Sequence, residues 1–170
     1  GPLYAASEGF VAKVLAKFGV KYVDFPAGAT REQIERILGR LEQGLAEGAL
    51  GIGINNGYVP AAGVHEMSLV ADLAARHDVP TFTHIQFMSN IDPASSQEAY
   101  LRLIAYAATS GAHMHICHLN STSLRDIERC AQLISVAQQH GLKITVEAYP
   151  YGAASTVVGA AFLADPCYCE

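Results

Sequence analysis

The sequence predicts an α/β fold in which parallel strand–loop–helix repeats form part of a TIM-like barrel. Short apolar runs alternate with amphipathic helical patterns about every 30 residues, so about four to five βα units can be followed. Hydrophobic residues make up 51% of the 170 residues and charged residues 16%, which favours strands buried on both faces. Two of the apolar runs also end in a histidine that opens a polar loop.

The N-terminal half shows local signals for several elements. The predicted elements are helix 5–18, strand 20–25, helix 30–48, strand 49–54, loop 55–60 and helix 65–76. Thr30 and Gln33 form a capping-box pattern, which predicts the start of a helix. Glycines interrupt the run 49–54, which indicates a buried strand where backbone approaches another group closely.

The C-terminal half continues the same repeat. The predicted elements are strand 81–85, loop 86–93, a helix from Ser95 or Ser96 to 110, strand 112–117, loop 118–123, helix 124–140, strand 142–148, exit loop 149–152 and helix 153–163. Gly111 and Gly141 follow the helical patterns and are plausible stop signals.

The repeat count bears on the completeness of the domain. A closed barrel has eight strands and about 250 residues, so residues 1–170 are expected to form a single partial barrel domain, a fragment of a longer protein. The open sheet edges would be covered by the missing part or by a second copy of the chain, as a homo-oligomer. A complete, doubly wound open sheet is the structural alternative, although no glycine-rich phosphate loop supports a nucleotide-binding version.

Composition excludes several classes of partner. The formal net charge is -5 and no basic stripe is visible, so nucleic acid is not an expected partner. No apolar run approaches the roughly 20 residues that span a membrane, so no membrane association is expected. The four cysteines show no disulfide framework, and the Cys167-x-Cys169 pair is expected to be ordinary thiols. A reducing, cytoplasmic compartment is therefore expected.

The main functional signal is the pair His84 and His118. Each histidine lies at the C-terminal end of a predicted strand in its own βα unit, the end where parallel barrels build their sites. Imidazoles bind zinc and other divalent transition metals, so we predict that this pair binds such an ion. Strand alternation from His118 predicts that Met114 and Ile116 face the barrel axis and that His113, His115 and Cys117 face outward.

Other polar residues allow two interpretations each. His113 and His115 form a competing metal pair, but we expect them to lie under the helices or at a rim. Glu147 could lie inside the barrel, where it would support a metal ligand or act as a base. Alternatively, it is a salt-bridged residue on the helix side of its strand. Tyr58 and Tyr149 follow strands and could bind polar substrate groups, or could be ordinary packing residues.

An ordered set of motifs resembles the N-acyl-D-amino-acid deacylases (D-aminoacylases) of the amidohydrolase superfamily. The motifs are Gly48-Ala49-Leu50-Gly51-Ile52-Gly53, Tyr58-Val59-Pro60, Thr83-His84-Ile85, His118-Leu119 and Tyr149-Pro150-Tyr151-Gly152-Ala153-Ala154-Ser155. The resemblance implies that His84 and His118 bind zinc, and that Tyr149 and Ser155 help to bind the substrate carboxylate. It implies a metal-dependent hydrolase in which activated water attacks the acyl carbonyl of a small N-acyl amino acid or related amide.

The sequence departs from this family in several places. Asn120 stands where the family usually has a substrate-binding Lys, and we expect Asn120 to help to position substrate together with Tyr58, Tyr149 and Ser155. Gln86 stands where the family usually has Arg, and Glu147 where Asp is common. The first-strand His-x-His, a further metal ligand and the last-strand Asp, which acts as general acid and base, are absent from these 170 residues. The isolated chain is therefore expected to be an incomplete enzyme. The alternative is a non-catalytic metal-binding or self-assembling half-barrel module.

Overall fold

The computed structural model describes residues 28–59 and 61–156. In chain order the elements are α2 (Arg31–Ala46), β1 (Ile52–Asn55), the 3-10 turn η1 (Asn56–Tyr58), α3 (Val64–Arg76), β2 (Thr81–His84), α4 (Ser96–Ser110), β3 (Met114–Ile116), α5 (Leu119–Ser123), the 3-10 turn η2 (Leu124–Asp126), α6 (Ile127–Gln139) and β4 (Ile144–Val146). The predicted helix 5–18 and strand 20–25 lie outside the described residues. The predicted start of helix 153–163 was wrong, because residues 153–156 have no regular structure; the rest of that prediction lies outside the described residues.

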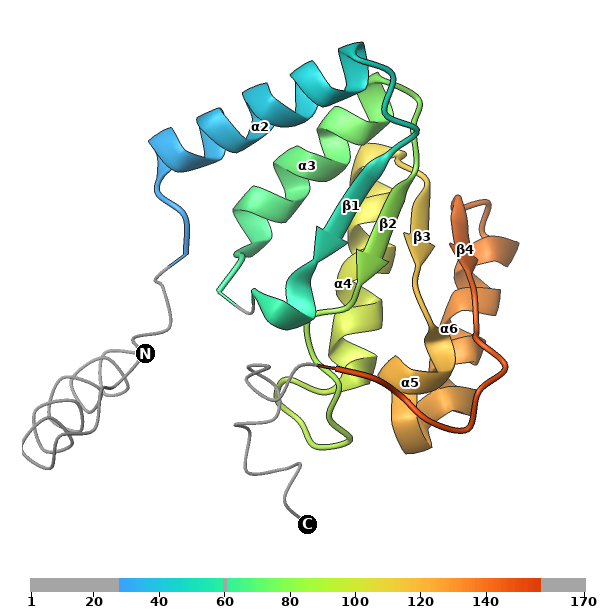
Figure 1. Cartoon of the computed structure of the whole chain (residues 1–170). Helices are drawn as coiled ribbons and strands as arrows, with labels where there is room; N and C mark the ends of the chain where they lie inside the picture. The colour runs from blue at the N-terminus through green and yellow to red at the C-terminus, as the bar shows by residue number, and fades with distance from the viewer. Residues whose placement is uncertain (1–27, 60, 157–170) are drawn as a thin grey trace, which may run out of the picture.

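The strands form one parallel sheet in the order β1-β2-β3-β4. The register pairs Asn55 with His84, Phe82 with His115, and Ile116 with Val146. Each strand therefore lies next to the strand that follows it in the chain, with a helix in the connection (Figure 1). This is the order expected for consecutive βα units of a barrel.

The helices form a single layer on one face of this sheet (Figure 1). Helix α2 packs on α3, α3 on α4, and α4 on α6, while α4 also contacts β3 and α6 contacts β4. A doubly wound sheet has helices on both faces, so the described residues do not form that alternative. The predicted class, an α/β fold with parallel repeats of a partial barrel, is confirmed.

Strand residues alternate between the two faces of the sheet. The prediction that Met114 and Ile116 face the barrel axis, with His113, His115 and Cys117 on the outer side, was wrong. Met114 and Ile116 are fully buried under the helices, together with Thr81 and Thr83 on the neighbouring strand. The opposite face, here called the open face, carries Gly53, Phe82, His115 and Thr145, and Phe82 is 43% exposed. His113, His115 and Cys117 therefore belong to the open face, because Met114 and Ile116 are needed to fill the apolar layer between β3 and α4.

The helix ends follow the sequence signals closely. Thr30 Oγ1 accepts a hydrogen bond from Gln33 N at 3.3 Å, and Thr30 N donates to Gln33 Oε1 at 2.7 Å. Ser95 caps α4 through Glu98 N at 3.2 Å, and Gly111 ends α4 with a left-handed φ of 75°. These contacts satisfy backbone groups that a helix end otherwise leaves unpaired.

Loop 118–123 was predicted without helical structure, and the structure corrects this. Residues Leu119–Ser123 form the short helix α5. Thr122 explains the difference, because its hydroxyl lies 2.9 Å from the Tyr100 hydroxyl and its carbonyl accepts from Ser96 Oγ at 2.8 Å. All three residues are fully buried, so α4 fixes a conformation that local sequence does not specify.

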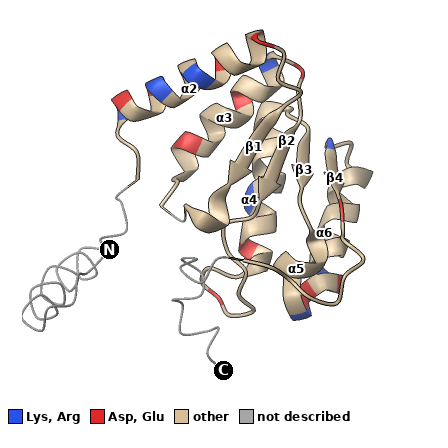
Figure 2. Cartoon of the chain, in the orientation of Figure 1, with Lys and Arg blue, Asp and Glu red and all other residues tan. Residues whose placement is uncertain are grey.

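Charged residues are unevenly distributed over the described elements. Figure 2 shows both signs interleaved along α2, and the four strands contain no Lys, Arg, Asp or Glu. Because positive and negative side chains are interleaved along α2, this helix has no surface patch of a single charge sign. Among the described residues, no helix is both long enough and apolar enough to cross a membrane.

Candidate metal site

The structure brings the two predicted histidines together at the carboxyl ends of neighbouring strands. His84 is the last residue of β2, and His118 directly precedes α5. His84 Nδ1 lies 3.1 Å from His118 Nε2, and the ring centroids are 4.8 Å apart. Residues 34 positions apart in the sequence therefore direct ring nitrogens at the same point.

His118 reaches this point through an unusual backbone conformation. Regular alternation would place it on the helix side with Met114 and Ile116. The chain instead leaves β3 and gives His118 φ 41° and ψ 62°, in the left-handed region that non-glycine residues seldom adopt. Glu147 supports this turn, since its Oε1 accepts from His118 N at 2.6 Å. Glu147 thus hydrogen-bonds the backbone of His118 and is not a salt-bridged residue on the helix side.

Neighbouring groups favour the protonation states that a metal ligand needs. The Ser121 hydroxyl lies 3.3 Å from the His118 carbonyl, to which it donates, and 3.2 Å from His118 Nδ1. It can therefore accept from Nδ1–H, which leaves the Nε2 lone pair directed at His84. Burial, together with the nearby His118, lowers the pKa of His84 to about 4, so His84 is neutral near pH 7.

The nitrogen pair fits a divalent transition metal. Two Zn–N bonds of about 2.0–2.1 Å at angles of roughly 90–110° place the two nitrogens about 2.9–3.4 Å apart. The observed separation of 3.1 Å lies within this range. Two unprotonated nitrogens at this distance repel each other unless a proton or an ion lies between them, and an ion bound by both would remove the repulsion.

Two residues that sequence analysis did not select shape this site. Gly57, in η1, is packed so tightly against His84 that an added Cβ would lie 2.4 Å from Nε2 and 2.5 Å from Cδ2. Ser121 orients His118, as described above. Ser121 follows His118 by one helical turn, a spacing that could have indicated it if α5 had been predicted. The closeness of Gly57 and His84 depends on the β1–β2 pairing and had no local signal.

A cavity of about 690 Å³ opens beside the histidines. Tyr58, Tyr149 and Ser155, which were predicted to bind substrate, all line it together with His84 and His118. The Tyr58 ring lies 5.1 Å from the His84 ring, and the Tyr149 ring lies 6.2 Å from the His118 ring, between centroids. The cavity thus combines two metal-binding side chains with aromatic and hydroxyl groups, as ligand pockets commonly do.

Asn120 has a different position from the other predicted substrate-binding residues. Its Nδ2 donates to the Tyr149 carbonyl at 2.9 Å, which joins α5 to the exit loop of β4. Asn120 does not belong to the lining of the cavity. Asn120 therefore holds the backbone of Tyr149 in place, and the Tyr149 side chain lines the cavity.

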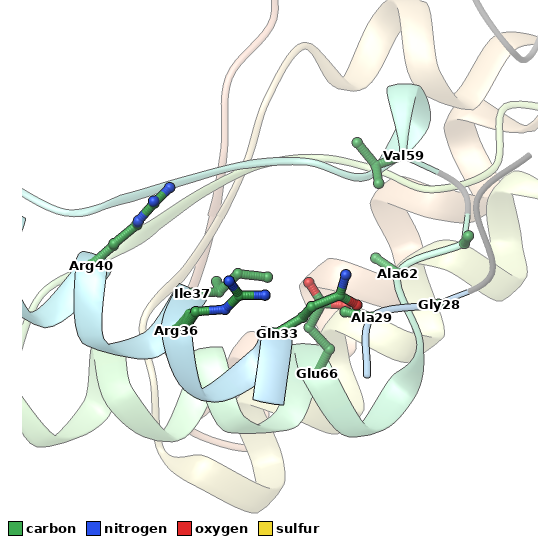
Figure 3. A pocket seen from close by; sticks show the side chains of 10 residues that line it. Gly28, Ala29, Gln33, Arg36, Ile37, Arg40, Val59, Ala62 and Glu66 are labelled. Carbon is green, nitrogen blue, oxygen red and sulfur yellow. The ribbon is translucent and has the colours of Figure 1, made fainter. Parts of the chain in front are cut away.

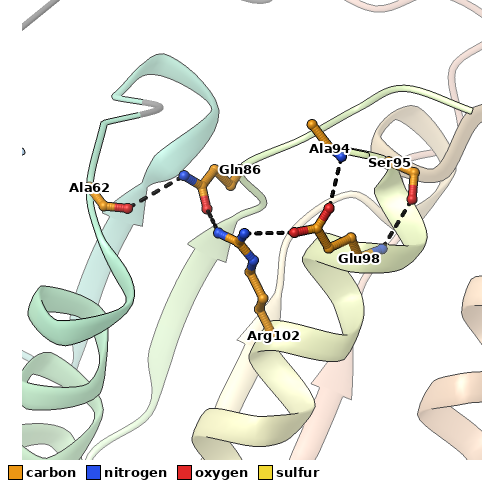
Figure 4. A network of polar contacts seen from close by, with 6 residues as sticks. All are labelled: Ala62, Gln86, Ala94, Ser95, Glu98 and Arg102. Carbon is orange, nitrogen blue, oxygen red and sulfur yellow. Dashed lines mark hydrogen bonds and ion pairs between the residues drawn. The ribbon is translucent and has the colours of Figure 1, made fainter. Parts of the chain in front are cut away.

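The loop after β2 is fixed by a polar network around Arg102 (Figure 4). Arg102 donates to Gln86 Oε1 at 2.9 Å and to Glu98 Oε1 at 2.6 Å, and Gln86 Nε2 donates to the Ala62 carbonyl at 3.4 Å. The backbone N of Ala94 and the Arg102 guanidinium lower the pKa of Glu98, despite the opposing effect of burial. Gln86 is thus a structural link between two loops beside the site.

A second cavity, of about 450 Å³, lies between α2 and the start of α3 (Figure 3). Arg36, Arg40 and Gln33 line it from α2, and Glu66 lines it from α3. It contains neither His84 nor His118, so it is not the candidate metal site.

Neither protein-family models nor curated proteins gave a match. Solved structures did match, and what they share with this chain is the fold. N-acyl-D-glutamate deacylase from Bordetella bronchiseptica, complexed with zinc and a phosphonate inhibitor, matches with TM-score 0.64 and 20% identity over 76% of this chain and 28% of that chain.

D-aminoacylase is the other matched protein. Its structure, which defines a novel subset of amidohydrolases, matches with TM-score 0.64 and 20% identity over 75% of this chain and 27% of that chain. A D-aminoacylase variant in complex with copper chloride matches equally, with 20% identity over 76% of this chain. The chain thus spans just over a quarter of these structures' length. The predicted resemblance is confirmed at the level of the fold.

Proposed function

We propose that this chain is the central part of a metal-dependent amidohydrolase barrel, in which His84 and His118 bind a divalent transition metal, most simply zinc. The observation that carries this proposal is the 3.1 Å approach of His84 Nδ1 to His118 Nε2 beside a cavity of about 690 Å³. The fold shared with zinc- and copper-bound deacylase structures adds support. A bound ion would supply Lewis-acid activation of water and of an amide carbonyl.

The proposed substrate is a small N-acyl-D-amino acid or a related amide. Tyr58, Tyr149 and Ser155 line the cavity beside the histidines, and their hydroxyls can hydrogen-bond a carboxylate or an amide carbonyl. The Tyr58 hydroxyl lies 2.9 Å from Thr156 Oγ1, which fixes that ring near the cavity wall. Because the chain spans just over a quarter of the matched structures, hydrolysis is proposed for a protein that also supplies the other catalytic groups.

Metal content tests the site directly. Elemental analysis after zinc loading and dialysis would compare the chain with His84→Ala, His118→Ala and, as the matched control, His65→Ala, which changes an exposed histidine on α3. Each site variant should contain about one zinc ion per chain fewer than the parent, and His65→Ala should equal it. Unchanged zinc content in both site variants would reject the proposed site.

Activity requires a separate test. A longer protein that contains this segment would be assayed for release of free amine from N-acetyl-D- and N-acetyl-L-amino acids. Zinc-dependent turnover of the D-substrates, abolished by His118→Ala, is the expected result. Zinc binding without turnover of either series would leave the metal site intact and reject the hydrolase.

The open face of the sheet favours a second candidate function, that of a non-catalytic half-barrel module that pairs with another copy of the chain. Phe82 is 43% exposed there, and within residues 28–59 and 61–156 the sheet ends in two edge strands, β1 and β4. Pairing would cover both features. This candidate predicts a zinc-binding dimer by light scattering, with no turnover. A monomer across the micromolar range would exclude it.

A further inference from the structure

Three potential metal ligands that the proposed site does not use meet on the open face. They are His115 in β3, Cys117 just after β3, and Glu147 just after β4. One ligand atom from each side chain lies within 4.8 Å of the other two. His115 and Cys117 are two residues apart and share a face, and the Ile116–Val146 register brings residue 147 beside residue 117.

Neighbouring contacts already orient two of these side chains. His115 Nδ1 lies 2.9 Å from Thr145 Oγ1, so its Nε2 is the nitrogen available to an ion. The Phe82 ring meets His115 edge-on at 5.4 Å between centroids and limits rotation of the imidazole. Glu147 Oε1 accepts from His118 N at 2.6 Å, which places the carboxylate and leaves its second oxygen for coordination.

We propose that His115, Cys117 and Glu147 form a second metal site, for a borderline-soft divalent ion such as Zn²⁺. An imidazole, a thiolate and a carboxylate together suit zinc or cobalt and do not suit Mg²⁺ or Ca²⁺, which take oxygen ligands. With water as the fourth ligand, the site is four-coordinate. On binding, Cys117 Sγ forms a bond to the ion and its thiol proton passes to solvent.

The distances require only a local adjustment. Tetrahedral zinc with about 2.0–2.1 Å bonds to nitrogen and oxygen and about 2.3 Å to sulfur places its ligand atoms about 3.3–3.6 Å apart. Atoms now within 4.8 Å must therefore approach by at most about 1.2–1.5 Å. Because His115 is held by its neighbours, rotation of the Cys117 and Glu147 side chains would supply this approach. His115 and Cys117 are partly exposed and Glu147 is exposed, so an ion can enter from solvent.

This site differs chemically from the His84–His118 pair, which contains no sulfur ligand. A thiolate bound to Co²⁺ gives a sulfur-to-metal charge-transfer band in the near ultraviolet, whereas imidazole ligands give none. The two sites are therefore distinguished by one spectrum. The proposal does not depend on the proposed hydrolase function, because it uses different ligands and a different signal.

Co²⁺ titration of the full chain tests this proposal. Cys167 and Cys169 are first replaced by Ser in every sample, which removes the thiols near the C-terminus. The charge-transfer band should appear, saturate and be displaced by Zn²⁺. It should vanish in Cys117→Ser and persist in Cys130→Ser, the matched control, because Cys130 is a buried thiol on α6.

Two further variants separate the sites. His115→Ala should lower the Co²⁺ affinity, read from the band, by at least about tenfold. The double variant that combines His84→Ala and His118→Ala should retain the charge-transfer band. Circular dichroism of each variant establishes that it is folded. A band that persists in folded Cys117→Ser, or no band in the folded parent at saturating Co²⁺, would overturn the second site.

Discussion

Replacement of Gly57 by Ala tests the packing that positions His84. Gly57 is buried in η1, and a Cβ there would lie 2.4 Å from His84 Nε2 and 2.9 Å from the Ile85 carbonyl oxygen. Ordinary contacts begin near 3.4 Å, so the imidazole must move by about 1 Å. The carbonyl belongs to the chain just after β2 and cannot move independently of the sheet.

The expected cost follows from these distances. Overpacking of a buried site costs about 1–3 kcal/mol of unfolding free energy, and the two ring contacts plus one backbone contact suggest about 2 kcal/mol. A ring shift of about 1 Å is also large against the 3.1 Å separation of His84 Nδ1 and His118 Nε2. Zinc affinity should therefore fall at least about tenfold.

Urea denaturation and competition with a zinc chelator would measure the two effects. Gly53→Ala is the matched control, because Gly53 lies on β1 and its Cβ would meet nothing within 4 Å. That control should be neutral or up to about 1 kcal/mol more stable. If Gly57→Ala has the stability and zinc affinity of Gly53→Ala, the inference that Gly57 positions His84 is wrong.

Three further predictions concern hydrogen bonds and acid stability. Ser121→Ala removes the hydroxyl that orients His118, so it should weaken zinc binding by about tenfold in chelator competition. The unfolding free energy should change by less than about 0.5 kcal/mol. A zinc affinity equal to that of the parent would contradict this prediction. Tyr100→Phe should lower the unfolding free energy by about 1 kcal/mol in urea denaturation, since it removes the buried contact with Thr122, and an unchanged midpoint would count against that contact. The pKa of His84 is about 4 in the folded chain, below its ordinary value of 6.5. As the pH is lowered, the unfolded state therefore binds the proton before the folded state does. The unfolding free energy should then fall as the pH decreases from about 6.5 to 4. Urea titrations at several pH values should show a smaller decrease in His84→Gln, and identical pH profiles would refute this cause.

Much of the architecture was predictable because it depends on local signals. Thr30 and Gln33, Ser95 and Gly111 mark helix ends through contacts within one turn, and the structure confirms those ends. The repeat of apolar runs and helical patterns predicted parallel βα units, since such strands need long crossover connections. The sequence also selected His84 and His118, because each lies at the carboxyl end of a strand in an equivalent unit.

The arrangement of side chains around β3 required the tertiary structure. Alternation shows that Met114 and His115 face opposite ways, but it does not say which face the helices cover. Burial on the side of α4 decided this in favour of Met114, which brought His115 to the open face beside Glu147. The sequence-based assignment was wrong because it assumed that regular alternation continues to His118.

What the sequence by itself determined is most of the described helices and strands and their parallel order, because period, caps and glycine stops are properties of neighbouring residues. It also singled out His84 and His118 as candidate metal ligands. Only the tertiary structure decided the left-handed turn at His118, the packing of Gly57 against His84 and the short helix α5. Each of these depends on contacts between residues far apart in the chain. Their energies are set by the pairing of β1 with β2, by the contact of Glu147 with His118 N, and by the packing of α5 on α4. No local pattern records these contacts.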